Sequence, residues 1–196
     1  MTTTQQLNEI AGNLWWSWNP DATDLFRRLN PDAYAASGNN PLVALKYAHD
    51  DVLADSAFQG DVADVHERFR AYMDAPPRIQ NAPRVSYFCM EYGLHESMKL
   101  YAGGLGILAG DHTKAASDVG LPFTAVGLLL RSGYFRQYFD EDGTQQDEYP
   151  AMDATLHPFE RITGEDGRDL TVTVHIGDQP VLIRGWKVMV GKTTLY

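Results

Sequence analysis

The segment from residue 85 to residue 130 constrains the fold more than any other part of the sequence. Residues 85–90 form a short, almost wholly apolar run, typical of a strand buried on both faces of a parallel sheet. A glycine-rich turn, Gly103-Gly104-Leu105-Gly106, leads into a helical segment that ends at Gly120, where glycine suits a left-handed helix cap. Residues 122–130 form a second apolar run. This order predicts a βαβ unit with parallel strands and a right-handed crossover.

The residues before this unit predict a string of short helices. Thr3-x-x-Gln6 has the form of a capping box. The apolar residues that follow at helical spacing predict one helix ending at Asn19-Pro20; they are Leu7, Ile10, Leu14, Trp15 and Trp18. Residues 61–75 show the pattern of an amphipathic helix, which Pro76-Pro77 ends. We therefore expect a helical N-terminal region over residues 1–80.

The remaining residues, 81–196, predict a region that forms sheets. After residue 132, short strand-like runs alternate with turns, which indicates antiparallel hairpins. Residues 75–82, which are rich in proline, are the best candidate for a linker. The predicted fold class is α/β: a helical region, then a βαβ unit, with β-hairpins at the C-terminal end.

Charge and length exclude several classes of function. The 196 residues carry a formal net charge of −10 at pH 7, which disfavours binding to nucleic acid or to an anionic membrane surface. The longest apolar stretch is far shorter than the roughly 20 residues needed to cross a bilayer. The first residues lack the pattern of a secretory signal, and Cys89 is the only cysteine. A cytoplasmic protein is the expectation.

The glycine turn, residues 103–106, is the most informative candidate for a site. Glycines let a backbone approach a ligand closely, and the N-terminus of the following helix offers free N–H groups with partial positive charge. The turn matches neither the Walker A motif nor the dinucleotide fingerprint GxGxxG. From spacing alone, an anion site and a turn packed for steric reasons are equally well supported.

The segment YFCMEYGLHES, residues 87–97, lies shortly before this turn. Together the two resemble the α-glucan phosphorylases, which act on glycogen, starch or maltodextrin, in particular the shorter prokaryotic type. Residues 87–97, YFCMEYGLHES, are similar to the YFSMEFGLHES segment of that family, with Cys89 and Tyr92 as departures. Residues 103–120 resemble its glycine loop and the following helix, and residues 127–137 resemble the next strand and turn. Residues 13–20 resemble the helical segment at its N-terminus. The resemblance covers most of the chain in order.

This resemblance implies phosphorolysis of the terminal α-1,4 bond of a glucan, which releases glucose 1-phosphate. It implies pyridoxal 5'-phosphate as cofactor and two Rossmann-like domains that face a cleft. Residues 81–196 would then be an incomplete Rossmann-like N-terminal domain, with β-hairpins at its C-terminal end. The backbone of Gly103, Gly104 and Gly106 would bind the phosphate, and Leu105 would lie against the glucosyl unit. The full-length form is compatible with a homo-oligomer.

The family's cofactor-bonding lysine and main phosphate-binding cations lie several hundred residues beyond Tyr196. We therefore expect an N-terminal portion of a phosphorylase that is inactive alone. Residues 187–191 resemble a strand inside a domain of the family, so the chain is expected to stop within a sheet and to leave an exposed sheet edge.

Further residues are weaker candidates. Glu91 could tune a sugar or phosphate site, and Gly93, His95, Arg131 and Arg136 could line a pocket. Asp111-His112 has no second histidine at metal-binding spacing, which favours a hydrogen-bonded structural pair. The tryptophans at 15, 16 and 18 favour a packed core over a glucan platform.

Two other functions stay open. A nucleotide-sugar glucosyltransferase of the starch or glycogen synthase kind also has a Gly-Gly-Leu loop before a helix. It usually carries lysine just before that loop, where this chain has Tyr101-Ala102. The other alternative is a non-catalytic module that binds glucan or a partner, which would be retained in a glucan affinity gel without turnover.

Overall fold

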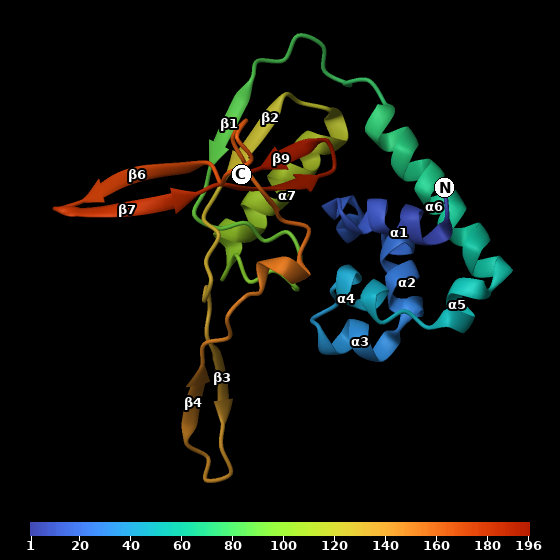
Figure 1. Cartoon of the computed structure of the whole chain (residues 1–196), viewed down its shortest axis with the longest axis horizontal. Coiled ribbons are helices and arrows are strands. Elements are labelled where there is room, and N and C mark those ends of the chain that lie inside the picture. Colours follow the sequence, from blue (N-terminus) through green and yellow to red (C-terminus); the bar gives the residue numbers. More distant parts are fainter.

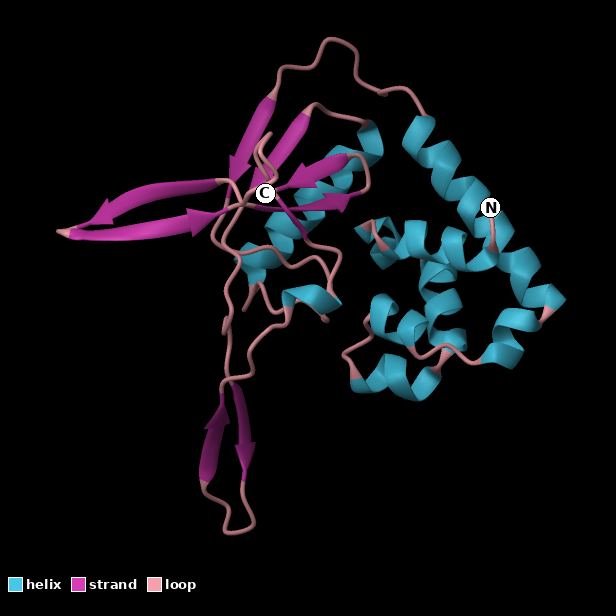
Figure 2. Ribbon diagram, viewed as in Figure 1, coloured by secondary structure: helices cyan, strands magenta, loops and turns pink.

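Helices dominate the first 80 residues of the computed structural model, which describes residues 1–196, and strands dominate the rest (Figures 1 and 2). The helices are α1 (Thr3–Ala11), the 3-10 helix η1 (Leu14–Trp18), α2 (Pro20–Leu29), α3 (Pro31–Ala36), α4 (Pro41–Lys46), α5 (Asp50–Ala54), α6 (Ser56–Asp74), α7 (Gly104–Val119) and the 3-10 helix η2 (Ala154–Leu156). The amphipathic helix and its end before Pro76-Pro77 are confirmed by α6, whose buried side includes Val62, Val65 and Phe69.

A five-stranded sheet forms the centre of the second part. Its strand order is β1-β2-β9-β8-β5. The strands β1, β2 and β9 are parallel, whereas β8 is antiparallel to both β9 and β5. Helix α7 connects β1 to β2, which confirms the βαβ unit, and Gly120 ends that helix in the left-handed conformation, with φ of 70°. The bounds are β1 (Val85–Phe88), β2 (Phe123–Val126), β5 (Glu160–Arg161), β8 (Trp186–Val190) and β9 (Thr193–Leu195).

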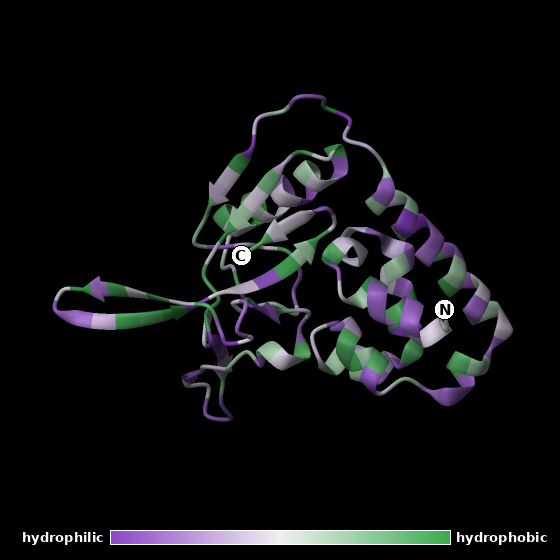
Figure 3. Ribbon diagram, turned by 45° about the horizontal axis from the view of Figure 1, so that its top comes forward, coloured by the Kyte–Doolittle hydropathy of each residue, from purple (hydrophilic) through white to green (hydrophobic).

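Two antiparallel hairpins project from this body, as expected for the residues after 132 (Figure 1). The first joins β3 (Arg136–Phe139) to β4 (Gln145–Glu148), and the second joins β6 (Thr171–Ile176) to β7 (Gln179–Arg184). The second hairpin carries much of the hydrophobic surface that Figure 3 shows away from the core.

The N-terminal helix differs from its prediction in two ways. The capping box is formed by Thr2 and Gln5, one residue earlier than expected. The helix also breaks at Gly12, and the remaining apolar residues form η1. The reason for the break is Asn13, whose side chain accepts a hydrogen bond from the Trp15 N–H and also binds the backbone of Gly191.

The first strand is less buried than its apolar sequence predicts. It lies at an edge of the sheet and ends at Phe88, which is 73% exposed. An edge strand has no neighbour on one side, and only alternate residues of β1 are partly covered. An open sheet edge was expected where the chain stops, but the strand that ends there, β9, pairs with both β2 and β8.

One cluster of 27 buried hydrophobic residues joins the helices to the sheet. Trp15 and Trp16 belong to it, which confirms that these tryptophans pack in the core. The division into units 1–80 and 81–196 stays a prediction. Every helix falls below the length or the apolar character that a membrane crossing requires.

Candidate functional site

The glycine turn lies at the N-terminus of α7, beyond the carboxyl end of β1. Gly103 is the N-cap residue, and no side chain caps the helix from within the turn. No atom lies within 4 Å of the position that a Cβ would take on Gly103 or Gly104, so the turn is open there. Ligands of parallel α/β sheets bind beyond the carboxyl ends of the strands, where this turn lies.

The carboxylate of Glu91 occupies the positive end of this helix. The Ala102 N–H donates to Glu91 Oε2 at 3.1 Å. This bond, together with the nearby Tyr134 hydroxyl and the N–H groups of Gly103 and Gly106, lowers the pKa of Glu91 below its ordinary value. Glu91 is thus ionised near neutral pH, and part of the turn's capacity to bind anions is already used.

Three glycines let the loop after β1 pack directly on α7. The Gly93 N–H donates to the Gly106 carbonyl at 2.7 Å. A Cβ on Gly106 would overlap the Tyr101 Cβ, and a Cβ on Gly110 would overlap the Gly93 carbonyl oxygen. Gly106 and Gly110 are four apart and therefore share one helix face. That spacing was the available signal for Gly110, which the sequence analysis missed.

His95 contacts the helical region. Its ring lies 4.5 Å from the Trp16 ring, centroid to centroid, in an edge-to-face arrangement. Its Nδ1 accepts the Ser97 N–H at 3.2 Å. Burial lowers the pKa of His95 to about 4, so its imidazole is neutral at pH 7.

Acid is expected to destabilise the protein through His95. Below pH 6.5 the unfolded chain protonates this histidine, whereas the folded chain does so only near pH 4. The urea midpoint should therefore fall between pH 7 and pH 4.5, and the fall should be smaller in His95→Gln. His157, whose pKa burial also lowers, keeps part of the dependence in that variant. An identical fall in both proteins would contradict the assignment.

The two arginines lie in different places. Arg131 lines a cavity of about 800 Å³ between the carboxyl ends of β2 and β9 and the base of the β6–β7 hairpin. Most of its lining is apolar and includes Phe159 and Trp186, whereas Glu91 and the glycine turn lie outside it. Arg136 begins β3 and pairs in register with Glu148. Tyr134 lies between the two arginines in sequence, and its hydroxyl helps to lower the pKa of Glu91. Sequence reasoning missed this residue.

A metal centre has no support in this structure, because no three histidine, cysteine or acidic side chains are grouped to hold an ion. His112 packs beside the rings of Tyr87 and Phe123, with centroids 5.0 and 5.1 Å away. The predicted hydrogen-bonded pair of Asp111 and His112 does not form, and the contacts of His112 are with these two rings.

An open glycine turn beyond the carboxyl edge of a parallel sheet is typical of α/β proteins that bind phosphorylated or sugar ligands. Residues 2–98 match a family described as a protein of unknown function, DUF3417. The chain is 38% identical to maltodextrin phosphorylase of Thermococcus litoralis over 97% of its own length. It is 38% identical to glycogen phosphorylase of Mycobacterium tuberculosis and 35% identical to that of Aquifex aeolicus, over 96% of its length in each case.

The chain is therefore a homologue of the α-glucan phosphorylases. It spans 24% of the length of the first two relatives and 28% of the third, about a quarter of these proteins.

Proposed function

We propose that this chain forms the glycine-turn part of an α-glucan phosphorylase, an enzyme that cleaves terminal α-1,4 bonds with phosphate to give glucose 1-phosphate. The observation that carries the proposal is the similarity to phosphorylases over nearly the whole chain, including the turn at the sheet edge. These relatives are named phosphorylases rather than synthases, which favours phosphorolysis over nucleotide-sugar transfer.

The glycine turn would contribute donors to the substrate phosphate. Gly103 and Gly104 are exposed. The Gly104 N–H can approach an anion, whereas the Gly103 N–H is shared with the Glu91 carboxylate. The Leu105 side chain is 55% exposed and can lie against a sugar ring. Gly106 is buried, and its part is to let the Glu91 loop approach the helix.

Glu91 would act as a positioning residue. Its carboxylate accepts a hydrogen bond from the Ala102 N–H and so holds the backbone of the turn in place for the substrate. Its negative charge also opposes tight binding of free phosphate, so the turn alone is a weak anion site. The other site candidates, Gly93, His95, Arg131 and Arg136, act through packing or lie further from the turn.

Pyridoxal 5'-phosphate, the family's cofactor, supplies a phosphate group that assists the attacking phosphate. The lysines described here fit its covalent attachment poorly. Lys114 donates to the Leu94 carbonyl, Lys187 pairs with Glu160, and Lys192 donates to the Ala75 carbonyl. The two other lysines, Lys46 and Lys99, are exposed. We place the attachment lysine outside these 196 residues, on a second Rossmann-like domain that faces this one. The whole enzyme would be cytoplasmic.

The purified chain of 196 residues is expected to form no glucose 1-phosphate when mixed with pyridoxal phosphate, maltoheptaose and inorganic phosphate. Phosphorolysis requires positioned charge on both sides of the substrate. A single helix N-terminus contributes about 0.3–1 kcal/mol to an exposed anion, well below the roughly 4 kcal/mol of millimolar binding. Turnover above a blank without protein would show that the chain holds a complete site.

A chimera tests the proposed function directly. This chain would replace the homologous segment of the Mycobacterium tuberculosis glycogen phosphorylase, and glucose 1-phosphate formation would be compared with that of the unmodified enzyme. An active chimera is expected. A chimera that folds and retains the cofactor but makes no product would refute the proposal.

A further inference from the structure

The β3–β4 hairpin has two faces of different chemistry. Its register pairs Arg136 with Glu148 and Phe139 with Gln145, and side chains alternate between faces along each strand. The same alternation places Phe135 opposite Tyr149, and their ring centroids lie 5.8 Å apart. One face, here called the aromatic face, therefore carries Phe135, Gln137, Phe139, Gln145, Asp147 and Tyr149.

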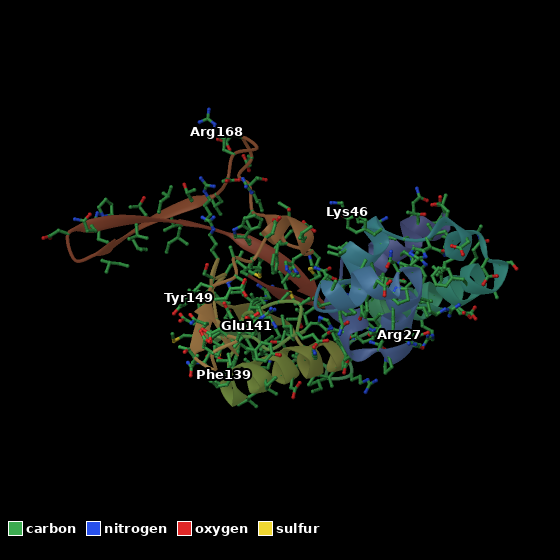
Figure 4. The ribbon with its side chains drawn as sticks, turned by 90° about the horizontal axis from the view of Figure 1, so that it is seen from below. Arg27, Lys46, Phe139, Glu141, Tyr149 and Arg168 are labelled. Carbon is green, nitrogen blue, oxygen red and sulfur yellow. The ribbon has the colours of Figure 1, made fainter.

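The aromatic face is exposed to solvent. Phe139 is 73% exposed, Tyr149 is 65% exposed and Phe135 is 48% exposed. Figure 4 looks at the molecule from the side to which this hairpin points and labels Phe139, Glu141 and Tyr149 on it. The opposite face carries Arg136 and Glu148, then Tyr138 and Gln146. The Phe135 and Tyr149 rings pack on each other and stabilise the ribbon, but no ring contact accounts for Phe139.

The charge of the hairpin selects a class of ligand. Residues 135–149 contain five carboxylates and one guanidinium, which repel nucleic acid, phosphate and anionic lipid. Aromatic rings offer flat apolar surfaces, and the amide and carboxylate groups between them offer hydrogen bonds. A neutral ligand with apolar faces and many hydroxyl groups, which is a polysaccharide, matches both properties.

The hairpin also starts close to the segment that leads into the glycine turn. A Cβ on Gly133 would lie 2.5 Å from the carbonyl oxygen of Lys99, which precedes the turn by four residues, and Phe135 follows Gly133 by two. From Phe135 to Phe139 the strand extends about 13 Å. A surface of this length can contact several units of an oligosaccharide rather than a single sugar. We infer that the aromatic face binds the glucan chain at a distance from its reacting end. This inference rests on the proposed function for the choice of an α-glucan.

The test measures binding without turnover. The dissociation constant of maltoheptaose is measured for the 196-residue chain by affinity electrophoresis and calorimetry. Combined Phe139→Ala and Tyr149→Ala should weaken binding about tenfold, which corresponds to about 1.4 kcal/mol. Tyr138→Ala, on the opposite face and 50% exposed, is the matched control and should leave binding unchanged. The single variant Phe139→Ala replaces a mostly exposed ring, so it keeps the test valid if the double variant unfolds.

Three results would overturn the inference. The chain could fail to bind maltoheptaose, the double and single variants could bind as tightly as the control, or the variants could abolish self-association measured by sedimentation while glucan binding stays unchanged. The last result would assign the aromatic face to a second copy of the chain. An inactive chimera would refute the proposed function without changing these binding constants, so the two failures are distinguishable.

Discussion

Replacing Gly110 by alanine is expected to lower the free energy of unfolding by about 3 kcal/mol, the upper end of the usual cost of overpacking. The added Cβ would overlap the Gly93 carbonyl oxygen and lie 2.7 Å from the Gly93 carbonyl carbon. Both are backbone atoms, so no side-chain rotation relieves the overlap. The loop can move only by losing the Gly93 bond to Gly106 and the Lys114 bond to the Leu94 carbonyl.

Urea denaturation measures this loss, and Gly60→Ala is its control. Gly60 lies in α6 with no atom within 4 Å of an added Cβ. Alanine there should stabilise the protein by about 0.5–1 kcal/mol, because glycine costs conformational entropy inside a helix. Equal shifts in the same direction for both variants would contradict the packing argument.

Asn13→Ala is expected to cost about 2–4 kcal/mol, because it leaves several buried backbone groups without partners. Asn13 is 6% exposed. Its Oδ1 accepts the Gly191 N–H at 2.7 Å and the Trp15 N–H at 3.0 Å, and its Nδ2 donates to the Gly191 carbonyl at 3.0 Å. These bonds fasten the N-terminal helices to the turn between β8 and β9.

The control for this variant is Asn8→Ala. Asn8 is exposed and donates only to the Thr4 carbonyl of its own helix, so its loss should change stability by less than about 0.5 kcal/mol. Both variants would be compared by urea denaturation. A loss for Asn13→Ala as small as that for Asn8→Ala would show that the Gly191 turn does not depend on this side chain.

The features that the sequence predicts correctly are those with local causes. The cap at Gly120, the end of α6 before two prolines and the hairpins each follow from residues within a few positions of the feature. The break after α1 has a distant cause, because Asn13 binds Gly191, 178 residues along the chain. The burial of β1 depends on its place in the strand order, which no local pattern encodes.

At the candidate site, too, the sequence predicts local features but not contacts between distant segments. The glycine turn can be predicted as the start of a helix. That the Glu91 carboxylate binds this turn depends on how the loop after β1 folds back. Tyr134 reaches Glu91 from a third segment. Whether the remaining candidates contact a ligand stays a prediction.

The place of β9 between β2 and β8 bears on how the protein assembles during synthesis. The N-terminal helices contact one another and can associate early, whereas the centre of the sheet consists of residues 193–195. Until these residues leave the ribosome, β2 can pair with β1 on one side but has no partner on the other. An open strand edge is a template for pairing with another chain. The nascent protein is therefore most exposed to aggregation just before its sheet closes, and a chaperone would protect it most at that stage.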